Sequence, residues 1–386
     1  MNHLLRTHEI LDADFVRGEN CSLFDRGGRR FVDFESGIWS TVLGHGHPAV
    51  TQALQAQAAE LVHLGTRFPS RIAEAAARDV LEVTGLGDGA CVFLSSGSEA
   101  VEFAAQAARH VTGRDLLLTL RTSYLAALGS AGAKRPAEWC LVDGVGANPL
   151  DPDEVLREVP FERIGAFVFE AGGSSPGFVR FPQAPVVDAI ARRVREHGGL
   201  LVCNEVTTGM GRTGRWFGFE HHALAPDAVA LGKGLGNGYP VSAVAMRRAF
   251  ATRLERTGLY YAQSHQNDPL GCAVARAVIA ALREGGWVER GAALGRDFLA
   301  DLQRLAARHA CVAEARGRGM LLALELDPAG GRTAEAVFRE LYARGFLVNY
   351  YPAGHLLRFD PALTMPEADV QALLGVLDEV LRGRAA

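Results

Sequence analysis

The chain has 386 residues, of which 48% are hydrophobic and 22% charged, and its formal net charge is −4 at pH 7. This length predicts two domains, or one large domain with an appendage, and the composition excludes a disordered chain. The weak negative charge argues against nucleic acid or an anionic membrane surface as a partner.

The N-terminal stretch MNHLLRTHEILDADF carries charges and histidines where a secretory signal needs a continuous apolar run. No run in the chain approaches the roughly 20 apolar residues of a membrane span. Six dispersed cysteines form no CxxC pair and no metal-ligand spacing. We therefore expect a cytoplasmic protein with reduced thiols and no membrane contact.

The first fifty residues contain the hairpin-like sequence CSLFDRGGRRFVDF, in which a turn at Asp25–Gly28 joins two alternating runs. We expect residues 1–50 to pack with the C-terminal part of the chain. Farther on, His45 and His47 have the spacing of two metal ligands, but no third ligand lies nearby, so we interpret them as part of a structural turn and expect no metal.

Between about residues 90 and 246, short apolar runs alternate with helical patterns. The runs that read as buried strands are Ala90–Leu94, Leu116–Leu120, Ala166–Glu170, Leu200–Val206, Ala228–Gly232 and Val241–Met246. Their alternation with helices at 98–111 and 185–197 predicts an α/β fold with a largely parallel sheet. The long helices after residue 269 suggest a smaller α+β domain, which gives a division into 1–50, 51–268 and 269–386.

The strand ending at Leu94 runs directly into Ser95-Ser96-Gly97-Ser98-Glu99-Ala100 and a helix. Such a turn presents free N–H groups and the positive end of the helix, and therefore binds phosphate. Ser96 and Glu99 have the spacing of a capping box. A plain helix cap without a ligand is the alternative interpretation.

A single lysine, Lys233, follows the apolar strand at 228–232 and lies among glycines in LGKGLGNGYP. An amine at such a position is partly desolvated, which lowers its pKa and prepares it for imine formation with an aldehyde. A solvated lysine in a glycine turn is the alternative. The GxGxG spacing of Gly234, Gly236 and Gly238 lacks the helix and acidic residue of a dinucleotide site, and no Walker loop occurs.

In this order, these motifs resemble the class III (ornithine/GABA/ω-amino acid type) aminotransferases of pyridoxal phosphate (PLP) fold type I. The resemblance extends over nearly the whole chain. It is carried by DFESGIW with LGHGHP, SSGSEA, SYLA, the strand end at Glu170, LLVCNEVTTGMGRTG, LGKG, SHQNDPLGCA and LRFDPALT.

The resemblance implies a mostly parallel seven-stranded sheet covered by helices, a smaller α+β domain, and PLP held as a Schiff base by Lys233. It also implies a ping-pong transfer between a small amine or amino acid donor and an oxo-acid acceptor. The implied cofactor-binding residues are Gly97, Ser98, Tyr124, Glu170, Asn204, Lys233 and Ser264. Trp39 and Arg358 are implied in substrate binding, the arginine as a clamp for a carboxylate. Since Ser264 stands where the family reaches the phosphate of the neighbouring subunit, a homodimer with the active site at its interface is also implied.

One residue departs from the family pattern: Asn204 replaces the acidic residue that meets the pyridine nitrogen. A carboxylate there keeps this nitrogen protonated, whereas a neutral amide can form a hydrogen bond but supplies no charge to raise the pKa of the nitrogen. Aminotransfer is the expected reaction. Racemisation, epimerisation or elimination at Cα, and a non-catalytic PLP-binding protein, stay open as alternatives.

Overall fold

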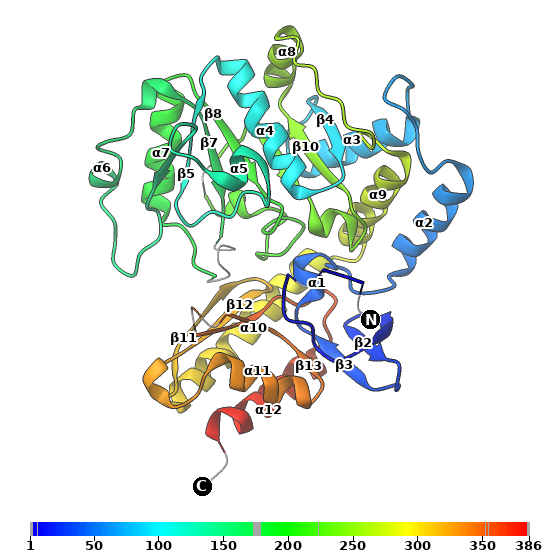
Figure 1. Cartoon of the computed structure of the whole chain (residues 1–386), viewed down its shortest axis with the longest axis vertical. Helices are drawn as coiled ribbons and strands as arrows, with labels where there is room; N and C mark the ends of the chain where they lie inside the picture. Colours follow the sequence, from blue (N-terminus) through cyan, green and yellow to red (C-terminus); the bar gives the residue numbers. More distant parts are fainter. Residues whose placement is uncertain are drawn as a thin grey trace.

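A computed structural model describes residues 3–5, 7–172, 179–222, 224–351, 353 and 355–383. Figure 1 shows a large α/β part and, below it, two smaller sheets with their helices. The large sheet has the strand order β4-β10-β9-β8-β7-β5-β6. Its strands are β4 (Ala90–Leu94), β5 (Leu116–Leu120), β6 (Trp139–Val142), β7 (Ile164–Glu170), β8 (Leu200–Asn204), β9 (Ala228–Leu231) and β10 (Ser242–Met246).

The predicted mostly parallel sheet is confirmed. Strands β5 to β9 pair in parallel, and β10 runs antiparallel to both β4 and β9. The sequence reading missed β6, because this strand has only four residues at the sheet edge and two of them are only half-buried. The other six predicted runs all contain a strand.

Helices cover both faces of this sheet, which explains why its central strands read as continuous apolar runs. Alternate residues of β7 belong to two different hydrophobic clusters, one on each face of the sheet. Ala166 and Val168 pack with helix α4 (Gly97–Thr112), whereas Phe167 and Phe169 pack with helix α7 (Ala184–Glu196). Helices α2 (Pro48–Glu60) and α3 (Arg71–Val83) both pack against α9 (Pro269–Glu284), and α8 (Arg248–Arg256) packs against α4.

The two smaller sheets have four strands each. One has the order β1 (Phe15–Glu19), β2 (Ser22–Asp25), β3 (Arg30–Asp33) and β13 (Phe346–Leu347); the other has the order β11 (Val312–Arg318), β12 (Leu321–Leu326), β15 (Leu356–Phe359) and β14 (Asn349–Tyr351). The predicted hairpin is confirmed as β2 and β3, with Gly28 at φ +83° in its turn. Strand β3 pairs in parallel with β13, so the first fifty residues share a sheet with the C-terminal part. The division at residues 50/51 and 268/269 itself stays a prediction.

The remaining helices are α1 (Ser36–Trp39), α5 (Gly129–Ala133), α6 (Pro152–Val155), α10 (Trp287–Arg308), α11 (Ala334–Ala343) and α12 (Glu367–Arg382). Short 3₁₀ turns occur at Phe161–Arg163, Gly218–His221, Lys233–Gly236 and Pro328–Gly330. Within the described ranges, none of the helices combines the length and the apolar character that crossing a membrane requires.

The carboxyl ends of the parallel strands meet at one edge of the large sheet, where open α/β sheets bind their ligands. Glu170 ends β7 and Asn204 ends β8, and these two residues are register partners. Lys233 follows the end of β9 by two residues, and Tyr124 follows the end of β5 by four. The sheet therefore gathers four residues that are far apart in the sequence.

Candidate active site

The turn before α4 is a capped helix start with N–H groups left for an anion. Ser96 Oγ accepts from the N–H of Glu99 at 3.3 Å, and Glu99 Oε2 accepts from the N–H groups of Ser95 and Ser96 at 3.0 and 2.7 Å, which confirms the predicted capping box. Gly97 and Ser98 are the first two residues of the helix, and N–H groups at this position have no acceptor within the helix. Ser98 Oγ accepts from the N–H of Ala127 at 2.9 Å, which leaves its own hydrogen to donate.

Gly97 lies where no larger residue fits. A Cβ at this position would be 2.4 Å from Cγ1 of Val206, and a Cβ on Gly232 would be 3.1 Å from Cα of Gly97. The turn before α4 and the segment that leads from β9 to Lys233 are therefore in direct contact.

This close approach gives a prediction for Gly97→Ala. The added methyl group must displace Val206 or the turn, and such overpacking costs about 1–3 kcal/mol. We expect the affinity for PLP to fall by roughly tenfold or more, measured by fluorescence titration of the cofactor-free protein. Gly375→Ala is the matched control, since Gly375 lies in α12 with open space around it. Equal PLP affinity in both variants would contradict the assignment of Gly97 to the cofactor site.

Lys233 and the Gly97 turn line one cavity of about 120 Å³. Its walls are formed by Ser96, Gly97, Ser98, Tyr124, Leu125, Asn204, Val206, Thr207 and Lys233. PLP requires an amine at its aldehyde, hydrogen-bond donors at its phosphate, and an aromatic ring and a polar group at its own ring. This cavity offers an amine, the N–H groups of a helix start, a hydroxyl, an aromatic ring and an amide. The residues present therefore fit this cofactor.

Burial lowers the pKa of the Lys233 amine below its ordinary value of 10.5; nearby Glu170 raises this pKa and nearby Arg358 lowers it further. The backbone of Lys233 has φ +42°, a conformation that costs energy in a residue with a side chain. Its Nζ lies 5.5 Å from the centre of the Trp39 ring. The amine is thus kept away from bulk water and is more readily deprotonated, as a nucleophile needs to be.

Tyr124 is held by its backbone on the ends of β7 and β8. Its N–H donates to Glu170 Oε2 at 2.9 Å, and its carbonyl accepts from Asn204 Nδ2 at 3.2 Å. Thr207 Oγ1 donates to the second carboxylate oxygen of Glu170 at 3.2 Å. Tyr124 is 43% exposed and lines the cavity. Glu170 is thereby placed as the residue that orders this wall of the cavity.

Trp39 and Arg358 form the neighbouring wall. The guanidinium carbon of Arg358 lies 3.7 Å from the centre of the Trp39 ring, and the arginine side chain is fully buried. Trp39 has φ +65° and ends a run of four left-handed residues that begins at Ser36. This unusual backbone turns the indole towards both Lys233 and Arg358.

The guanidinium of Arg358 is already engaged on three sides within the chain. Its Nε donates to Asp360 Oδ1 at 2.8 Å and its Nη1 donates to the hydroxyl of Tyr351. The side-chain amide of Asn349 is taken in the orientation that gives both its oxygen and its nitrogen a partner. In this orientation Arg358 Nη2 donates to the Asn349 oxygen at 2.8 Å, and the Asn349 nitrogen donates to Glu35 Oε1 at 2.9 Å. A carboxylate that reaches Arg358 must therefore replace Tyr351 or Asn349.

The charge of Arg358 gives a prediction about pH. In the predicted role of Lys233, its deprotonated amine is the form that captures the PLP aldehyde, so the capture rate is expected to rise as pH rises through the pKa of Lys233. Because Arg358 lowers this pKa, Arg358→Met raises it and moves the midpoint of the rate profile to higher pH, whereas Arg358→Lys keeps the charge and stays near the wild type. The profiles are measured by stopped-flow absorbance on cofactor-free protein. A midpoint in Arg358→Met at or below that of the wild type would contradict the prediction.

Sequence reasoning missed a second buried arginine, Arg212, beneath this wall. Its Nη1 donates to the carbonyl oxygens of Met320, at 3.0 Å, and Pro361, and its Nη2 donates to Ser36 Oγ at 3.1 Å. Arg212 is part of the quoted GMGRTG stretch, yet its partners lie more than one hundred residues away in the sequence, so spacing gave no sign of its role.

Ser264 does not belong to the described residues that line the cavity. It is exposed, but its neighbour Gln263 donates to Ser95 Oγ at 3.0 Å and to Glu99 at 3.3 Å. Ser264 therefore follows a residue that is hydrogen-bonded to the turn before α4. Its predicted role towards a second subunit stays a prediction.

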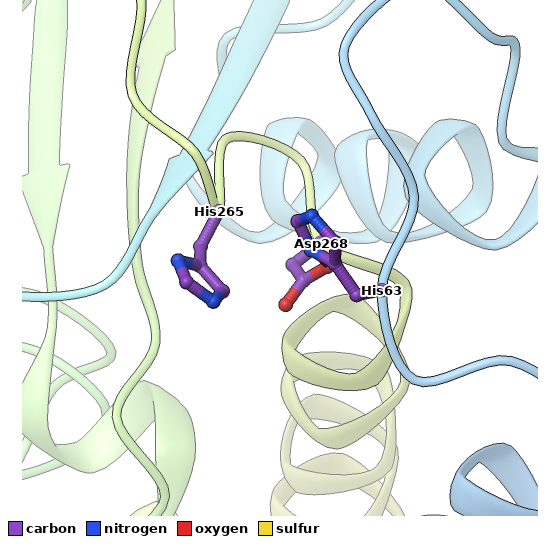
Figure 2. Close-up of side chains that lie close together, drawn as sticks. All are labelled: His63, His265 and Asp268. Carbon is purple, nitrogen blue, oxygen red and sulfur yellow. Dashed lines mark hydrogen bonds and ion pairs between the residues drawn. The ribbon is translucent and has the colours of Figure 1, made fainter.

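A cluster next to Ser264 contains His63, His265 and Asp268, with one possible ligand atom from each within 4.8 Å of the others (Figure 2). This cluster has no signature in residue spacing, because His63 lies in the α2–α3 connection, whereas His265 and Asp268 directly precede α9. His63 Nδ1 lies 2.8 Å from Asp268 Oδ1, which is closer than the roughly 3.3 Å between two tetrahedral ligands at about 2.0–2.1 Å from zinc. The contact is therefore a hydrogen bond of a His–Asp pair, which links the α2–α3 connection to the turn before α9.

His45 is one of the two histidines considered as metal ligands from the sequence. Its Nε2 lies within hydrogen-bond distance of Asp33 Oδ2, at 2.7 Å.

Comparisons with known proteins agree with this geometry. The family model of the class III aminotransferases matches residues 5–129 and 150–381. The acetylornithine aminotransferase of Gloeobacter violaceus is 33% identical over 396 residues, covering 98% of this chain and 95% of that protein. The acetylornithine aminotransferase of Caldanaerobacter subterraneus subsp. tengcongensis is 30% identical over 391 residues, covering 98% and 97%. Among solved structures, an (S)-enantioselective omega-transaminase from Thermomicrobium roseum superimposes with a TM-score of 0.89 at 25% identity, covering 100% of this chain and 97% of that one.

Proposed function

Because the chain belongs to the class III aminotransferase family and is thus a PLP-dependent enzyme of amino group transfer, we propose which residues and substrates carry the reaction. The observation that carries the proposal is the shared cavity: Lys233, with its lowered pKa, and the helix start at Gly97 and Ser98 line the same walls. When bound, PLP supplies an aldehyde that exchanges amines and a ring that draws electrons away from the substrate carbon that bears the reacting amine.

In this proposal Lys233 Nζ attaches the cofactor and, once freed by the incoming amine, takes a proton from the substrate carbon that bears the reacting amine and delivers it to the cofactor carbon bonded to the same nitrogen. Gly97 and Ser98 hold the phosphate through N–H groups and the Ser98 hydroxyl. Tyr124 covers the ring, Asn204 meets the ring nitrogen, and Glu170 fixes the backbone of Tyr124. Trp39 excludes water from the amine of Lys233 because its indole lies beside it.

For substrates we propose the terminal amine of an ornithine-type amino acid as donor and a 2-oxo acid as acceptor. The names of the relatives at 30–33% identity support the donor class. Arg358, which lies against Trp39 and acts electrostatically on Lys233, supports an acceptor or donor with a carboxylate. The carboxylate would displace Tyr351 or Asn349 from the guanidinium.

The test is a pair of half-reactions on purified holoenzyme. N-acetylornithine, ornithine, a β-amino acid, an ω-amino acid and an amino sugar are each added without acceptor, and conversion of PLP to pyridoxamine phosphate is followed by absorbance. We expect the ornithine-type donors to convert the cofactor and 2-oxoglutarate to restore it. Conversion only by the amino sugar or the β-amino acid would overturn the donor class. Exchange of Cα hydrogen for deuterium without conversion would instead indicate racemase chemistry, which the comparisons do not favour.

We also propose a homodimer whose interface contains Ser264. Exposed apolar side chains support it: Phe68 is 65% exposed and Tyr260 is 88% exposed, and both lie in segments that flank the His63–Asp268 pair. Light scattering on the holoenzyme should then give twice the chain mass of 41.3 kDa.

We propose a cytoplasmic location, which the six unpaired cysteines support. Fractionation of the native host tests it.

A further inference from the structure

The side-chain amide of Asn204 is fixed in one orientation by the backbone on both sides. Its Oδ1 accepts from the N–H of Val206 at 3.1 Å, and its Nδ2 donates to the carbonyl of Tyr124 at 3.2 Å. Turning the amide over would place its NH₂ group against an N–H group and its oxygen against a carbonyl oxygen. Both contacts would then be repulsive, and since Asn204 is only 2% exposed, water cannot relieve them.

This orientation presents a donor to the cavity. An amide NH₂ group carries two hydrogens, and the Tyr124 carbonyl takes one of them. The second hydrogen is available to a ligand in the cavity that Asn204 lines. The amide oxygen, by contrast, already accepts a hydrogen bond from the N–H of Val206, whose side chain lies close to Gly97.

The charges around this position do not favour a further cation. The carboxylate of Glu170 is engaged by Tyr124 and Thr207, and it acts on two cations, Lys233 and Lys134. Arg358 adds a third cation on the side of Lys233. A protonated ring nitrogen would thus enter a site whose carboxylate is already shared between cations, and it would meet a neutral amide.

We infer that Asn204 donates Nδ2–H to the ring nitrogen of the cofactor and thereby keeps that nitrogen unprotonated. The inference rests on the proposed function, since it assumes the cofactor pose in which the ring nitrogen meets β8. An unprotonated ring withdraws less electron density from the substrate carbon that bears the reacting amine. Lys233 Nζ must then deliver the proton to the cofactor carbon almost as soon as the proton leaves the amine-bearing carbon of the substrate, so that little negative charge develops on that carbon.

The test measures the protonation state of the cofactor ring nitrogen directly. Wild type and Asn204→Asp are reconstituted with PLP labelled with ¹⁵N in the ring, and the ¹⁵N chemical shift is measured by solid-state NMR without any substrate. We expect the wild-type signal at the position of neutral pyridine and the Asn204→Asp signal at the position of pyridinium. A pyridinium signal in the wild type would overturn the inference, and so would the same neutral signal in both proteins.

A second measurement covers the case in which Asn204→Asp fails to fold or to bind PLP. Wild type is titrated with PLP and with 1-deaza-PLP, in which a C–H group replaces the ring nitrogen. Loss of an accepted hydrogen bond should weaken binding of the analogue by about tenfold, whereas equal affinity would overturn the inference. Failure of the wild type to bind PLP at all would instead refute the proposed function, so the two failures are distinguishable.

Discussion

Lys233→Ala is expected to lower turnover by roughly 10³-fold or more and to remove the covalent attachment of PLP. A missing general acid/base alone costs about 10²–10⁴-fold, and the missing nucleophile adds to this loss. The structure makes the loss hard to compensate, because Trp39 lies beside the amine and the cavity is small. The measurements are single-turnover rates with the best donor and borohydride reduction followed by peptide mass mapping.

The chain offers an unusually clean control, since Lys134 and Lys233 are its only lysines. Lys134 is also half-buried and also acts on Glu170, but its Nζ donates to the carbonyl of Ser123 and it does not line the cavity in the part of the chain described. Lys134→Ala should therefore keep PLP attached through Lys233. Borohydride labelling at Lys134 in the wild type, or turnover in Lys233→Ala close to that of the wild type, would refute the assignment.

The parts of the fold that sequence predicted are those set by local patterns. Continuous apolar runs identified the buried strands, and the spacing of Ser96 and Glu99 identified the start of α4, because each depends on residues only a few positions apart. The resemblance then named Lys233, Tyr124, Glu170 and Asn204, and the structure places all four at one edge of the sheet.

What sequence did not predict depends on contacts between distant segments. Nothing in the letters around Arg358 shows that Tyr351, Asn349 and Asp360 engage its guanidinium, because two of these partners lie on the neighbouring strand β14. Likewise, the need for glycine at position 97 arises from Val206, more than one hundred residues away. Tertiary contacts of this kind have no signature in spacing or periodicity.

Arg212 is the strongest case of such a contact, and Arg212→Met is expected to destabilise the protein by about 3–5 kcal/mol, the usual cost of removing one member of a buried charged network. The side chain is 1% exposed, and burial lowers its pKa to about 10. It joins the loop after β8 to Ser36, at the start of the turn that carries Trp39, and to the carbonyl of Pro361, next to Asp360. Asp360 is fully buried, and the charges of Arg358 and Arg212 both lower its pKa, so the variant removes one of these two charges.

Urea unfolding of the cofactor-free protein measures the change, and Arg121→Met is the matched control. Arg121 pairs with Asp143 at 3.0 Å on the surface, where both side chains are more than half exposed, and such pairs contribute about 0–1 kcal/mol. A role of Arg212 in stability alone would leave the half-reaction rates of the folded variant unchanged.

We expect a further effect, because Arg212 also holds the segments that bear Trp39 and Arg358. The KM for the carboxylate substrate should rise more than kcat falls. A variant as stable as Arg121→Met would show that the network does not depend on Arg212.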